Sequence, residues 1–510
     1  MEWTDLAKTL FMTAYTFALA MVSLYGLHRY MLVYLYYRHR HKAPRPQGSF
    51  KDLPVVTVQL PMYNERFVAR RIIEKTCQID YPREKLQIQV LDDSTDDTCQ
   101  IAEAAVEEAR AAGFVIEYIH RTDRQGFKAG ALENGLRTAK GEFISIFDAD
   151  FVPERSFLNR SIHYFTDPKV CAVQTRWDHL NRGDSLLTRS QAIFLDGHFA
   201  IEHVARNRSD RFMSFNGTAG TWRRLAIQSS GGWQHDTLTE DLDLSYRAQM
   251  RGWKFVFLPE LAAPAELPPE MSAFKAQQFR WTKGGAQTAL KLLPKVLMSR
   301  LPMKVKIEAF FHLTCFTMHM YMLVLVALML PAMYLRCVPV EDGTYWRVAF
   351  DLGVFTLATL SASVFYCAGQ AELFGDWRSA LKYMPVMMAL GVGLCLSNTK
   401  AILEALLGLK SEFIRTPKYG DKRSLARTDA HKLAVSEKRS MLPYLEFAFG
   451  LYMMACAVLS IVGLLRSAIL TPFLVIFTFG FFYVSVLSLL SQRAARARKQ
   501  PAGVPAQPQA

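Results

Sequence analysis

The sequence has no closely spaced cysteines. Its eight cysteines stand singly along the chain, none forms a C-x-x-C pair, and most lie in or beside apolar segments. Small secreted proteins pair their cysteines in disulfides, and zinc sites use them as closely spaced thiolates. The cysteine pattern therefore argues against both a disulfide framework and a zinc site.

Acidic residues are scarce relative to basic ones, with 46 Asp and Glu against 60 Lys and Arg and a formal net charge of +14. Such a surplus could bind nucleic acid, but the basic residues concentrate beside apolar segments, where contact with anionic lipid and control of membrane orientation explain them better. The chain is 51% hydrophobic and its mean hydropathy is positive. The composition predicts a chain that is part soluble and part in lipid, with no nucleic-acid partner.

Five apolar stretches are long enough to cross a bilayer, which takes about 20 residues of helix. They cover 9–37, 309–335, 348–371, 442–465 and 468–490. The first contains Ala18-Leu19-Ala20, which resembles a signal-peptide cleavage site, but the apolar run continues well beyond it. We therefore expect a multi-pass integral membrane protein with a retained N-terminal anchor.

A sixth apolar stretch, 383–397, is only about 15 residues long, and the charges around it predict its position. Segment 410–439 carries nine Lys or Arg, and basic residues also follow the first and last spans. Basic flanks stay on the cytosolic side, so 46–305 and 410–439 share that side and an even number of crossings separates them. The spans 309–335 and 348–371 supply that number. Stretch 383–397 should then lie in the interface or re-enter without crossing, although a helix of a soluble hydrophobic core is an alternative.

These observations divide the chain into a membrane anchor, a cytosolic α/β domain and a helical bundle interrupted by a cytosolic loop. The expected segments are 1–45 (anchor and basic flank), 46–305 (cytosolic domain ending in amphipathic interface helices), 306–372 (two membrane helices), 373–408 (interfacial or re-entrant helix), 409–440 (basic cytosolic loop), 441–491 (two membrane helices) and 492–510 (basic tail, predicted to be disordered).

The region from 50 to 265 alternates short apolar or β-branched runs with helical patterns. Runs 55–60, 88–91 and 143–147 follow this rule, which is typical of a doubly wound, Rossmann-like parallel sheet in an α/β fold. Each run ends in polar residues, and ligands bind at the carboxyl ends of the strands in such sheets. Three acidic strand ends would therefore share one crevice.

Acidic residues at these strand ends indicate a divalent cation. Asp148 and Asp150 are two residues apart at a strand end and can face the same way. Crowded carboxylates repel each other unless a cation or hydrogen bonds compensate, and Mg²⁺ or Mn²⁺ accepts such oxygen ligands while leaving positions for phosphates. We expect Asp93 in the same site, whereas Asp96 and Asp97 are better explained as a turn and a helix cap.

Seven motifs occur in order between residues 55 and 305. They are Tyr63-Asn64-Glu65, Val90-Leu91-Asp92-Asp93-Ser94-Thr95-Asp96, Lys128-Ala129-Gly130, Phe147-Asp148-Ala149-Asp150-Phe151, Phe215-Asn216-Gly217-Thr218-Ala219-Gly220, Thr239-Glu240-Asp241-Leu242-Asp243-Leu244 and Gln277-x-x-Arg280-Trp281. The set resembles the inverting family 2 glycosyltransferases, and among them the cellulose-synthase-like A and C proteins, which are mannan, glucomannan and β-glucan synthases. The resemblance implies a cytosolic GT-A domain joined to an α-helical transmembrane bundle.

The resemblance also implies a donor site for a nucleotide sugar, UDP-glucose or GDP-mannose. Its residues would be Tyr63, Glu65, Asp93, Lys128, Asp148, Gln277 and Arg280. Asp93 would bind the base or ribose, and Lys128 and Arg280 would neutralise the diphosphate. Asp148 and Asp150 would hold Mg²⁺ or Mn²⁺ on it. A solvated surface lysine is the alternative explanation of Lys128.

In the same family, the position of Asp241 implies the general base, with Glu240 beside it in the catalytic pair. The acceptor residues would be Asn216, Gly217 and Trp281. A base takes the proton of the acceptor hydroxyl, and Glu240 and Asp243 could raise the pKa of Asp241 toward a useful value. A charge at a helix N-terminus is another reason for an aspartate at 241. Arg280 and Trp281 could instead anchor a helix at the bilayer edge.

The segment Phe413-Ile414-Arg415-Thr416-Pro417-Lys418-Tyr419-Gly420 is similar to the gating loop of cellulose synthases, Phe-x-Val-Thr-x-Lys-Gly, from which it departs at Arg415 and Pro417. The resemblance implies that Phe413, Arg415, Thr416 and Lys418 form a loop that closes over the donor diphosphate. As exposed charges, Arg415 and Lys418 would add little to stability. A plain cytoplasmic linker near an anionic leaflet is the alternative.

The sequence thus predicts a processive hexosyltransferase that extends a β-1,4-linked glucan, mannan or glucomannan at a cytosolic site and passes it through its own spans. Tyr321, Phe365 and Tyr366 are candidates for lining that path. The partners would be the nucleotide sugar, the growing β-glycan and membrane lipid, and accessory export subunits are left open. The membrane would be the inner (plasma) membrane of a bacterium or the Golgi membrane of a eukaryote.

Two other functions remain at this level. A transferase that moves a single sugar onto a lipid such as ceramide or diacylglycerol uses the same motifs and needs no channel. A non-catalytic transporter or scaffold with a decayed transferase domain would have lost Asp148, Asp150, Asp241 or Arg280, and the chain keeps all four.

Overall fold

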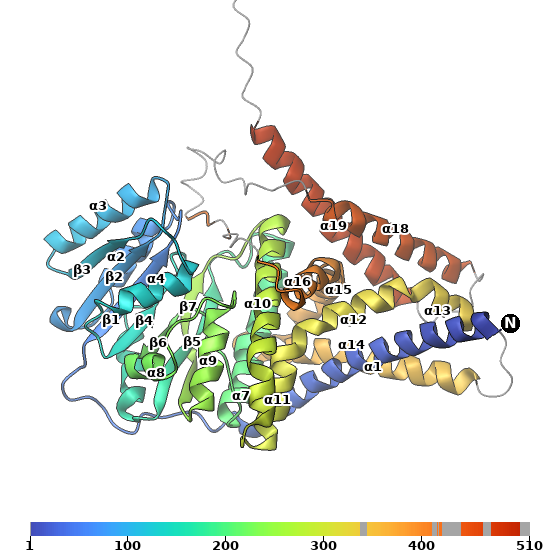
Figure 1. Cartoon of the computed structure of the whole chain (residues 1–510), viewed down its shortest axis with the longest axis horizontal. Coiled ribbons are helices and arrows are strands. Elements are labelled where there is room, and N and C mark those ends of the chain that lie inside the picture. The colour runs from blue at the N-terminus through green and yellow to red at the C-terminus, as the bar shows by residue number, and fades with distance from the viewer. Residues whose placement is uncertain are drawn as a thin grey trace, which may run out of the picture.

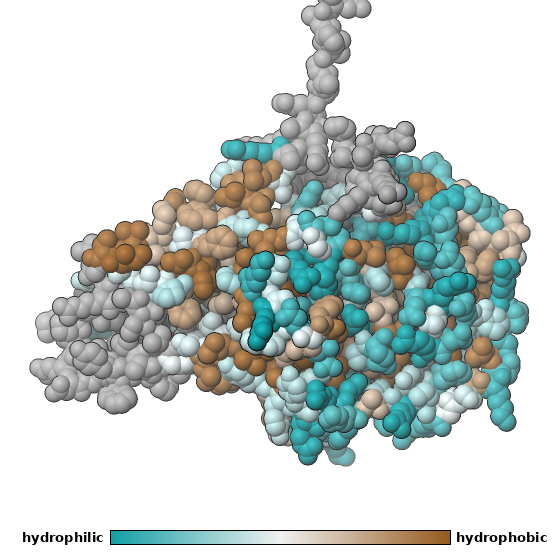
Figure 2. All heavy atoms as spheres, turned by 180° about the vertical axis from the view of Figure 1, so that it is seen from behind, coloured by the Kyte–Doolittle hydropathy of each residue, from teal (hydrophilic) through white to brown (hydrophobic). Residues whose placement is uncertain are grey.

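The computed structural model describes residues 2–336, 344–410, 416, 418–420, 440–462 and 471–499. An α/β domain lies at one end of the molecule, and long helices extend from it (Figure 1). Helix α1 (Glu2–His39) belongs to the helical part, and its C-terminal end reaches the α/β domain. The surface is mostly hydrophilic over the α/β domain, and hydrophobic patches gather over the helices (Figure 2).

The α/β domain is built on one seven-stranded sheet with the order β3-β2-β1-β4-β6-β5-β7. Its strands are β1 (Val56–Met62), β2 (Leu86–Asp92), β3 (Val115–His120), β4 (Phe143–Ile146), β5 (Val170–His179), β6 (Gly220–Arg223) and β7 (Lys254–Ala265). The predicted α/β class is confirmed. The sheet is mixed, however, because β6 pairs antiparallel with both β4 and β5 whereas the other pairs are parallel. This short strand follows a turn with positive φ at Gly217 and Ala219, and a turn of that kind reverses the chain.

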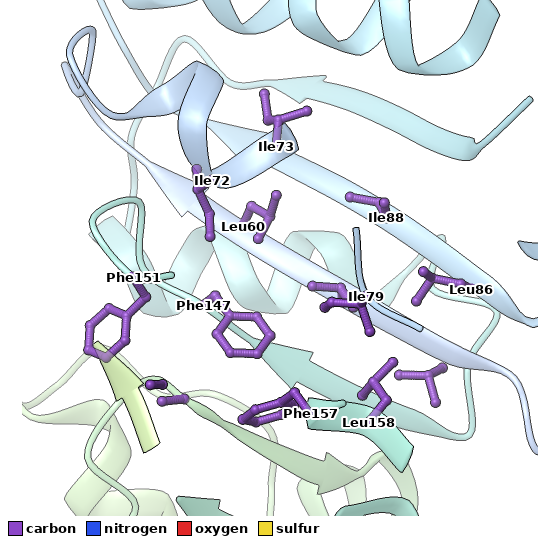
Figure 3. Packing of buried hydrophobic residues seen from close by; sticks show 14 of the residues in the cluster. Leu60, Ile72, Ile73, Ile79, Leu86, Ile88, Phe147, Phe151, Phe157 and Leu158 are labelled. Carbon is purple, nitrogen blue, oxygen red and sulfur yellow. The ribbon is translucent and has the colours of Figure 1, made fainter. Parts of the chain in front are cut away.

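The sheet has a hydrophobic cluster on each face, because side chains alternate along its strands. The first cluster joins Leu60 of β1 and Phe147, directly after β4, to Ile72 of α2 (Ala69–Cys77) (Figure 3). Helix α3 (Thr98–Ala111) and the short helices η1 (Arg83–Lys85), α5 (Phe157–Ser161) and η2 (Ile162–Thr166) lie in the segments of the chain that connect the strands from β1 to β5. The second cluster includes Ile144 and Trp222 of the strands. It also includes Leu32 of α1 and Phe365 of α14 (Thr344–Phe374), a helix that comes later in the chain. The helical part is therefore packed directly onto the sheet domain.

The second face is covered by α4 (Phe127–Leu136), α8 (Arg224–Ser229) and α9 (Glu240–Met250), which supply Leu132, Ala226 and Leu244 to that cluster. Between β5 and β6 the chain forms one continuous helical run of three segments. These are α6 (Leu186–Gly197), η3 (His198–His203) and α7 (Val204–Arg208), and η3 is a single π-helical turn. A capping box at Ser185 and Thr188 starts α6.

After β7 the chain is helical in all of its described secondary structure. The helices are α10 (Met271–Met298), α11 (Met303–Thr314), η4 (Cys315–Thr317), α12 (Met318–Ala327), α13 (Met329–Arg336), α14 (Thr344–Phe374), α15 (Trp377–Gly393), α16 (Cys395–Leu406), α18 (Leu442–Ile461) and α19 (Thr471–Lys499). Five helical stretches are long and apolar enough to cross a membrane by length and composition, among the described residues. They are Asp5–His39, Met303–Ala327, Trp377–Leu406, Leu442–Ile461 and Thr471–Arg493.

The five stretches differ from the predicted spans at two places. The predicted span 348–371 falls within α14, which is not among the five, and it stays a prediction. The stretch around 383–397 is longer than the sequence pattern indicates, because α15 and α16 together extend from 377 to 406. By length alone this pair of helices could cross a membrane.

Contacts at both ends of α15 and α16 support the prediction that they do not cross. Just before α15, Gln370 Nε2 donates to Asp196 of α6 over 2.6 Å. Near the end of α16, Lys283 of α10 forms an ion pair with Glu404 at 2.8 Å. In the apolar 18-residue part of this stretch, 72% is buried inside the protein, against 28–39% in the corresponding parts of the other four stretches. Both ends therefore contact the α/β domain side, as an interfacial or re-entrant element would.

Candidate active site

The carboxyl ends of β1, β2 and β4 open into one pocket, which α9, α10 and the segment after α16 complete. The pocket is lined by every predicted site residue that the structure describes. These are Tyr63, Glu65, Asp93, Lys128, Asp148, Asp150, Asn216, Gly217, Glu240, Asp241, Gln277, Arg280, Trp281, Thr416 and Lys418. The predicted loop residues Phe413 and Arg415 lie outside the described residues.

Asp241 and Glu240 occupy the first turn of α9, in the pocket. Burial, and then the neighbouring carboxylate of Glu240, raise the pKa of Asp241 to about 7. Burial also raises the pKa of Glu240, and Lys128 opposes that shift. The expected contribution of Asp243 is wrong: its carboxylate turns away to Arg247 and Lys291, at 2.7 Å and 2.8 Å. The position on the helix decides this, because 243 is two residues after 241 and therefore lies about 200° around the helix from it.

Lys128 is inside the pocket and not on the solvated surface. Its Nζ forms an ion pair with Asp148 and donates to the carbonyl oxygen of Gly217 over 2.9 Å. Burial alone would lower the pKa of Lys128, but the carboxylates of Asp148 and Glu240 outweigh it and raise the pKa. The ammonium group is therefore held charged beside the carboxylates, so the alternative of a solvated lysine is wrong.

Asp93 has a partner that the sequence pattern did not reveal. Arg121, directly after β3, donates from Nε and Nη2 to the two oxygens of Asp93 over 2.8 Å and 2.5 Å. Bidentate pairs of this kind fix the plane of the carboxylate. The neighbouring acidic residues are used differently. Asp96 accepts from the backbone N of Thr98 (3.0 Å) at the start of α3, as expected of a turn and cap. Asp97 stands at the N-cap position of α3, but its side chain makes no cap hydrogen bond and pairs with Arg66 instead (3.1 Å).

Asp150 is paired with the predicted gating segment. Lys418 Nζ lies 2.6 Å from Asp150 Oδ2, and only 15% of the Lys418 side chain is exposed. The expectation that Lys418 is an exposed loop charge is therefore wrong. Glu266, which sequence reasoning missed, accepts from the backbone N of Tyr419 (2.8 Å) and pairs with Arg71 (2.7 Å). Its only sequence signal is an acidic residue directly after β7.

Asp148 and Asp150 have the chemistry of a site for a hard divalent cation. Both follow β4, both carry only oxygen donors, and each is neutralised by a lysine, Lys128 for one and Lys418 for the other. Two lysines paired with two neighbouring carboxylates indicate a strongly negative position, and a divalent cation would also neutralise that charge. The residues thus fit Mg²⁺ or Mn²⁺ with phosphate oxygens completing the ligand shell.

Helix α10 brings Gln277, Arg280 and Trp281 into the pocket, so the alternative of an anchor at the bilayer edge is wrong for this Arg-Trp pair. Gly284 permits this position, because a Cβ there would lie 2.8 Å from the backbone N of Thr239, immediately before Glu240 and Asp241. Burial lowers the pKa of Arg280 overall, although the carboxylates of Glu240, Asp148 and Asp241 act in the opposite direction. A guanidinium stays charged despite such a shift, and it shares the pocket with these carboxylates.

The pocket also contains aromatic residues at the end of β5 that sequence reasoning missed. Trp177 and His179 line it together with Trp281. Among the described residues, Trp177 Nε1 and His179 Nε2 are buried without a hydrogen-bond partner. Burial lowers the pKa of His179 to about 3, so the ring is neutral. An apolar wall with unsatisfied polar atoms is suited to a sugar, which offers both C–H faces and hydroxyls.

A second cavity lies among α1, α12, α14, α15 and α19. Polar residues in its wall include Arg29, His319, Thr359 and Tyr366. Of the three aromatic residues proposed for a path through the spans, only Tyr366 lines it. Tyr321 packs against Phe17 of α1 with ring centroids 5.9 Å apart, and Phe365 belongs to the hydrophobic cluster beneath the sheet.

The described cysteines are free, as the sequence pattern predicts. One group with metal-binding atom types, Asp92, Cys99 and His120, lies beside the pocket. Asp92 already accepts from Tyr118 Oη and from the backbone N of Ser94, both over 2.8 Å. Burial raises the pKa of the Cys99 thiol. These atoms are therefore engaged in holding the strand ends.

A family model described as "Glycosyltransferase like family 2" matches residues 54–284. Two similar curated proteins are from Arabidopsis thaliana. Glucomannan 4-beta-mannosyltransferase 9 is 35% identical over 79% of this chain and 74% of that protein, and glucomannan 4-beta-mannosyltransferase 2 is 43% identical over 49% of this chain and 48% of that protein. The chain thus spans about half the length of some of the curated relatives that it matches.

Among solved structures, a mannosyltransferase from Pyrobaculum calidifontis in complex with GDP-Man and Mn²⁺ aligns with a TM-score of 0.48. It is 21% identical, and the alignment covers 70% of this chain and 99% of that chain.

Proposed function

This chain belongs to the family 2 glycosyltransferases, and on that premise we propose that it is a processive, inverting β-1,4-mannosyltransferase that extends a mannan or glucomannan. The observation that carries the proposal is the pocket in which the buried carboxyl of Asp241 shares a cavity with Lys128, Arg280 and two strand-end aspartates. Mannose is the preferred donor sugar because the curated relatives are named glucomannan 4-beta-mannosyltransferases. UDP-glucose remains the alternative to GDP-mannose as donor.

The donor half of the site would hold the nucleotide diphosphate. Lys128 and Arg280 are charged, buried and able to donate to phosphate oxygens. Tyr63, Glu65 and Asp93 line the part of the pocket beyond the aspartates and would contact the nucleoside. Asp148 and Asp150 would hold Mg²⁺ or Mn²⁺, which supplies positive charge where the leaving diphosphate becomes more negative.

The reaction would be a single displacement at the anomeric carbon. Asp241 takes the proton from the acceptor hydroxyl, whose oxygen forms the new bond to the anomeric carbon. The bond from that carbon to the diphosphate oxygen breaks, and its electron pair leaves with the nucleotide. Attack opposite the leaving group inverts an α-linked donor to a β-linked product. A carboxyl with a pKa near 7 is a stronger base than an ordinary aspartate and is still half ionised near neutral pH.

The acceptor half of the site would hold the end of the growing glycan. Trp281 and Trp177 offer flat faces for sugar rings, and Asn216, Gly217 and His179 line the same cavity. The unpartnered Nε atoms of Trp177 and His179 could hydrogen-bond to sugar hydroxyls. Holding the attacking hydroxyl close to the donor carbon lowers the entropy cost of the reaction.

A membrane path for the product is part of the proposal. The second cavity has Arg29, His319 and Tyr366 in a wall that is otherwise rich in methionine and phenylalanine. Intramembrane polar residues of this kind mark substrate pathways in many membrane proteins. We propose that the glycan passes between α1, α12, α14 and α15, away from a cytosolic active site. A transferase that adds one sugar to a lipid is the second candidate, favoured only by the apolar character of that cavity.

The test is a transfer assay with purified protein in detergent or lipid, supplied separately with labelled GDP-mannose and UDP-glucose. A large product from GDP-mannose that a β-1,4-mannanase degrades is the expected result. A small, chloroform-soluble product would favour the glycolipid function. If the wild type transfers neither sugar, and its signal is no higher than that of the Asp241→Asn variant, the proposed activity is refuted.

A further inference from the structure

Asn216 at the acceptor side of the pocket is held by two histidines of the π-helical turn η3. His203 Nε2 lies 2.6 Å from Asn216 Oδ1, and His198 Nε2 lies 3.0 Å from Asn216 Nδ2. The amide therefore donates to His198 and accepts from His203. A ring that accepts at Nε2 carries its proton on Nδ1, and His198 Nδ1 lies 3.0 Å from Glu202 Oε2.

The π-helical turn is what allows two rings to reach one amide. Residues five apart lie about 140° from each other around an α-helix, so only one of them could face Asn216. In η3 the i→i+5 bonding brings the rings of His198 and His203 to a centroid distance of 4.3 Å. A π-helix is rare and is retained mostly at functional sites.

The same network continues from Glu202 into the membrane helices. Arg206 forms an ion pair with Glu202 and donates from Nε to Glu308 Oε1 of α11 over 2.8 Å. Glu308 Oε2 accepts from His28 Nε2 of α1 over 3.1 Å. Burial alone would raise the pKa of Glu202, but Arg206 and His198 outweigh it and keep the pKa well below its usual range. One buried arginine thus faces two carboxylates, and two histidine N–H groups supply the remaining donors.

The other side of Asn216 faces the reacting groups. Next in the chain is Gly217, whose φ of +82° is the left-handed region, and whose carbonyl accepts from Lys128. A Cβ on Gly217 would lie 3.0 Å from Asp241 Oδ2. The backbone at 216–217 is therefore a wall shared by the proposed base and the proposed diphosphate lysine. A shift of this wall would move both groups.

We propose that the buried network of His203, His198, Glu202, Arg206, Glu308 and His28 is a positioning device that fixes Asn216 beside the base and ties it to α1. The expected effect on kcat rests on the proposed function. The expected effect on the position of Asn216 rests on the hydrogen bonds alone. None of the six side chains touches the reacting atoms. They act through the Asn216–Gly217 wall, and the membrane helices α1 and α11 hold its far end.

The first test replaces the donor to Asn216 while keeping its packing. His203→Phe preserves the ring contacts with Phe199 and Phe257, whose centroids lie 5.4 Å and 5.1 Å from the histidine ring, and His203→Gln keeps an N–H at the position of Nε2. We expect His203→Phe to lower kcat for transfer about tenfold with donor KM changed less than about threefold, since small misplacements cost this much. His203→Gln should recover at least half of the lost kcat. Equal losses in both variants, or none in either, would overturn the proposal.

Hydrogen exchange of the peptide covering 213–219 tests the structural claim without any transfer reaction. Exchange there should be faster in His203→Phe than in the wild type and close to wild type in His203→Gln. If the wild type transfers neither donor sugar, the proposed function fails while this measurement still decides the inference. An unchanged exchange rate at 213–219 in His203→Phe would contradict the proposed positioning role.

The link to α1 is tested by a double-mutant cycle. His28→Phe keeps the stacking on Phe311 (centroids 4.2 Å apart) and removes the hydrogen bond to Glu308. It should speed exchange at 213–219 and lower kcat by a smaller factor than His203→Phe. The double variant should lose less than the product of the two single losses, because both act on one network. A loss equal to that product, with exchange at 213–219 unaffected by His28→Phe, would overturn the connection to α1.

Discussion

Asp241 owes its proposed role to surroundings that shift its pKa in opposite directions. Burial and Glu240 raise its pKa, while the backbone N of Leu242 and the ammonium of Lys128 lower it. The net result, a pKa of about 7, is far from that of a solvated aspartate and close to neutral pH. At the residue scale, the environment therefore turns an ordinary carboxylate into a stronger base.

Replacing Asp241 with asparagine should abolish transfer while keeping the donor bound. The amide preserves the shape of the side chain but cannot take a proton, and loss of a general base typically costs about 10²–10⁴-fold in rate. Initial transfer rates and the Kd of the nucleotide, from calorimetry, measure the two effects. The exposed Asp123→Asn is the matched control and should behave like the wild type. Transfer by Asp241→Asn above about a tenth of the wild-type rate would remove Asp241 as the base.

The pH dependence follows from the raised pKa of Asp241. The carboxyl is protonated below its pKa and cannot act as a base, so kcat/KM should fall as pH drops through about 7. The fall should approach tenfold per pH unit on the acid side. Because Glu240 interacts with Asp241, the midpoint belongs to the pair. A profile from pH 5 to 9 measures it, and a flat rate down to pH 5 would contradict the raised pKa.

The loop after α16 illustrates what an element adds to the site. Thr416 and Lys418 line the pocket although they lie far from the other site residues in the sequence. Lys418 pairs with Asp150, and the backbone of Tyr419 and Gly420 donates to Glu266. The described residues 416 and 418–420 therefore lie at the site, with the ammonium group of Lys418 at a carboxylate that a divalent cation would also bind.

Removing that ammonium group should change cation binding in the absence of nucleotide. Lys418→Ala should bind Mn²⁺ more tightly, by roughly tenfold, because a positive charge no longer competes at Asp150. Titration followed by electron paramagnetic resonance measures free Mn²⁺. Transfer should fall in the same variant because the loop no longer closes over the donor.

The exposed Lys410→Ala is the matched control for Lys418→Ala and should leave both quantities unchanged. Chelation of the wild type should stop transfer, and Mg²⁺ or Mn²⁺ should restore it. Full activity in excess chelator would contradict the cation site, and identical Mn²⁺ affinities in Lys418→Ala and wild type would contradict the competition.

At the scale of the whole molecule, the α/β domain and the helical part share their interior. Leu32 of α1 and Phe365 of α14 are buried in the same cluster as Trp222 of the sheet. Lys275 of α10 forms a buried ion pair with Glu446 of α18 at 2.7 Å. Buried contacts of this extent give the two parts little freedom to move separately, which suits a site that feeds a membrane path.

Membrane topology is the prediction at this scale. Single cysteines at exposed positions of a cysteine-free variant would be treated with a membrane-impermeant thiol reagent from outside. A cysteine at Lys8 should react, whereas cysteines at Asp123 and Lys410 should react only after permeabilisation. The reason is that basic flanks favour the cytosolic side, and that the contacts Gln370–Asp196 and Lys283–Glu404 tie both ends of α15 and α16 to the part of the molecule that holds the site. External labelling at Lys410 would mean that α15 and α16 cross the membrane.

The sequence by itself determined the α/β class and much of the membership of the pocket, although it did not indicate Trp177, His179 or Glu266. Short apolar or β-branched runs ending in polar and acidic residues predict strand ends that meet at one edge, so Asp93, Asp148 and Asp150 could be expected together from local pattern alone. The motif at Asp241 and the helix carrying Arg280 were predicted by resemblance. Apolar length and flanking charge predicted most of the membrane segments.

Only the tertiary structure decided which of these residues contact each other. Lys418 on Asp150, Arg121 on Asp93 and the network from Asn216 to His28 join residues that are up to 280 positions apart. The antiparallel β6 and the π-helical η3 are similar cases, since no local periodicity encodes them. Contacts at long sequence separation depend on how whole elements pack, and buried polar groups then require specific partners whatever their distance along the chain. That is why the sequence could name the residues of the site but not the bonds that hold them.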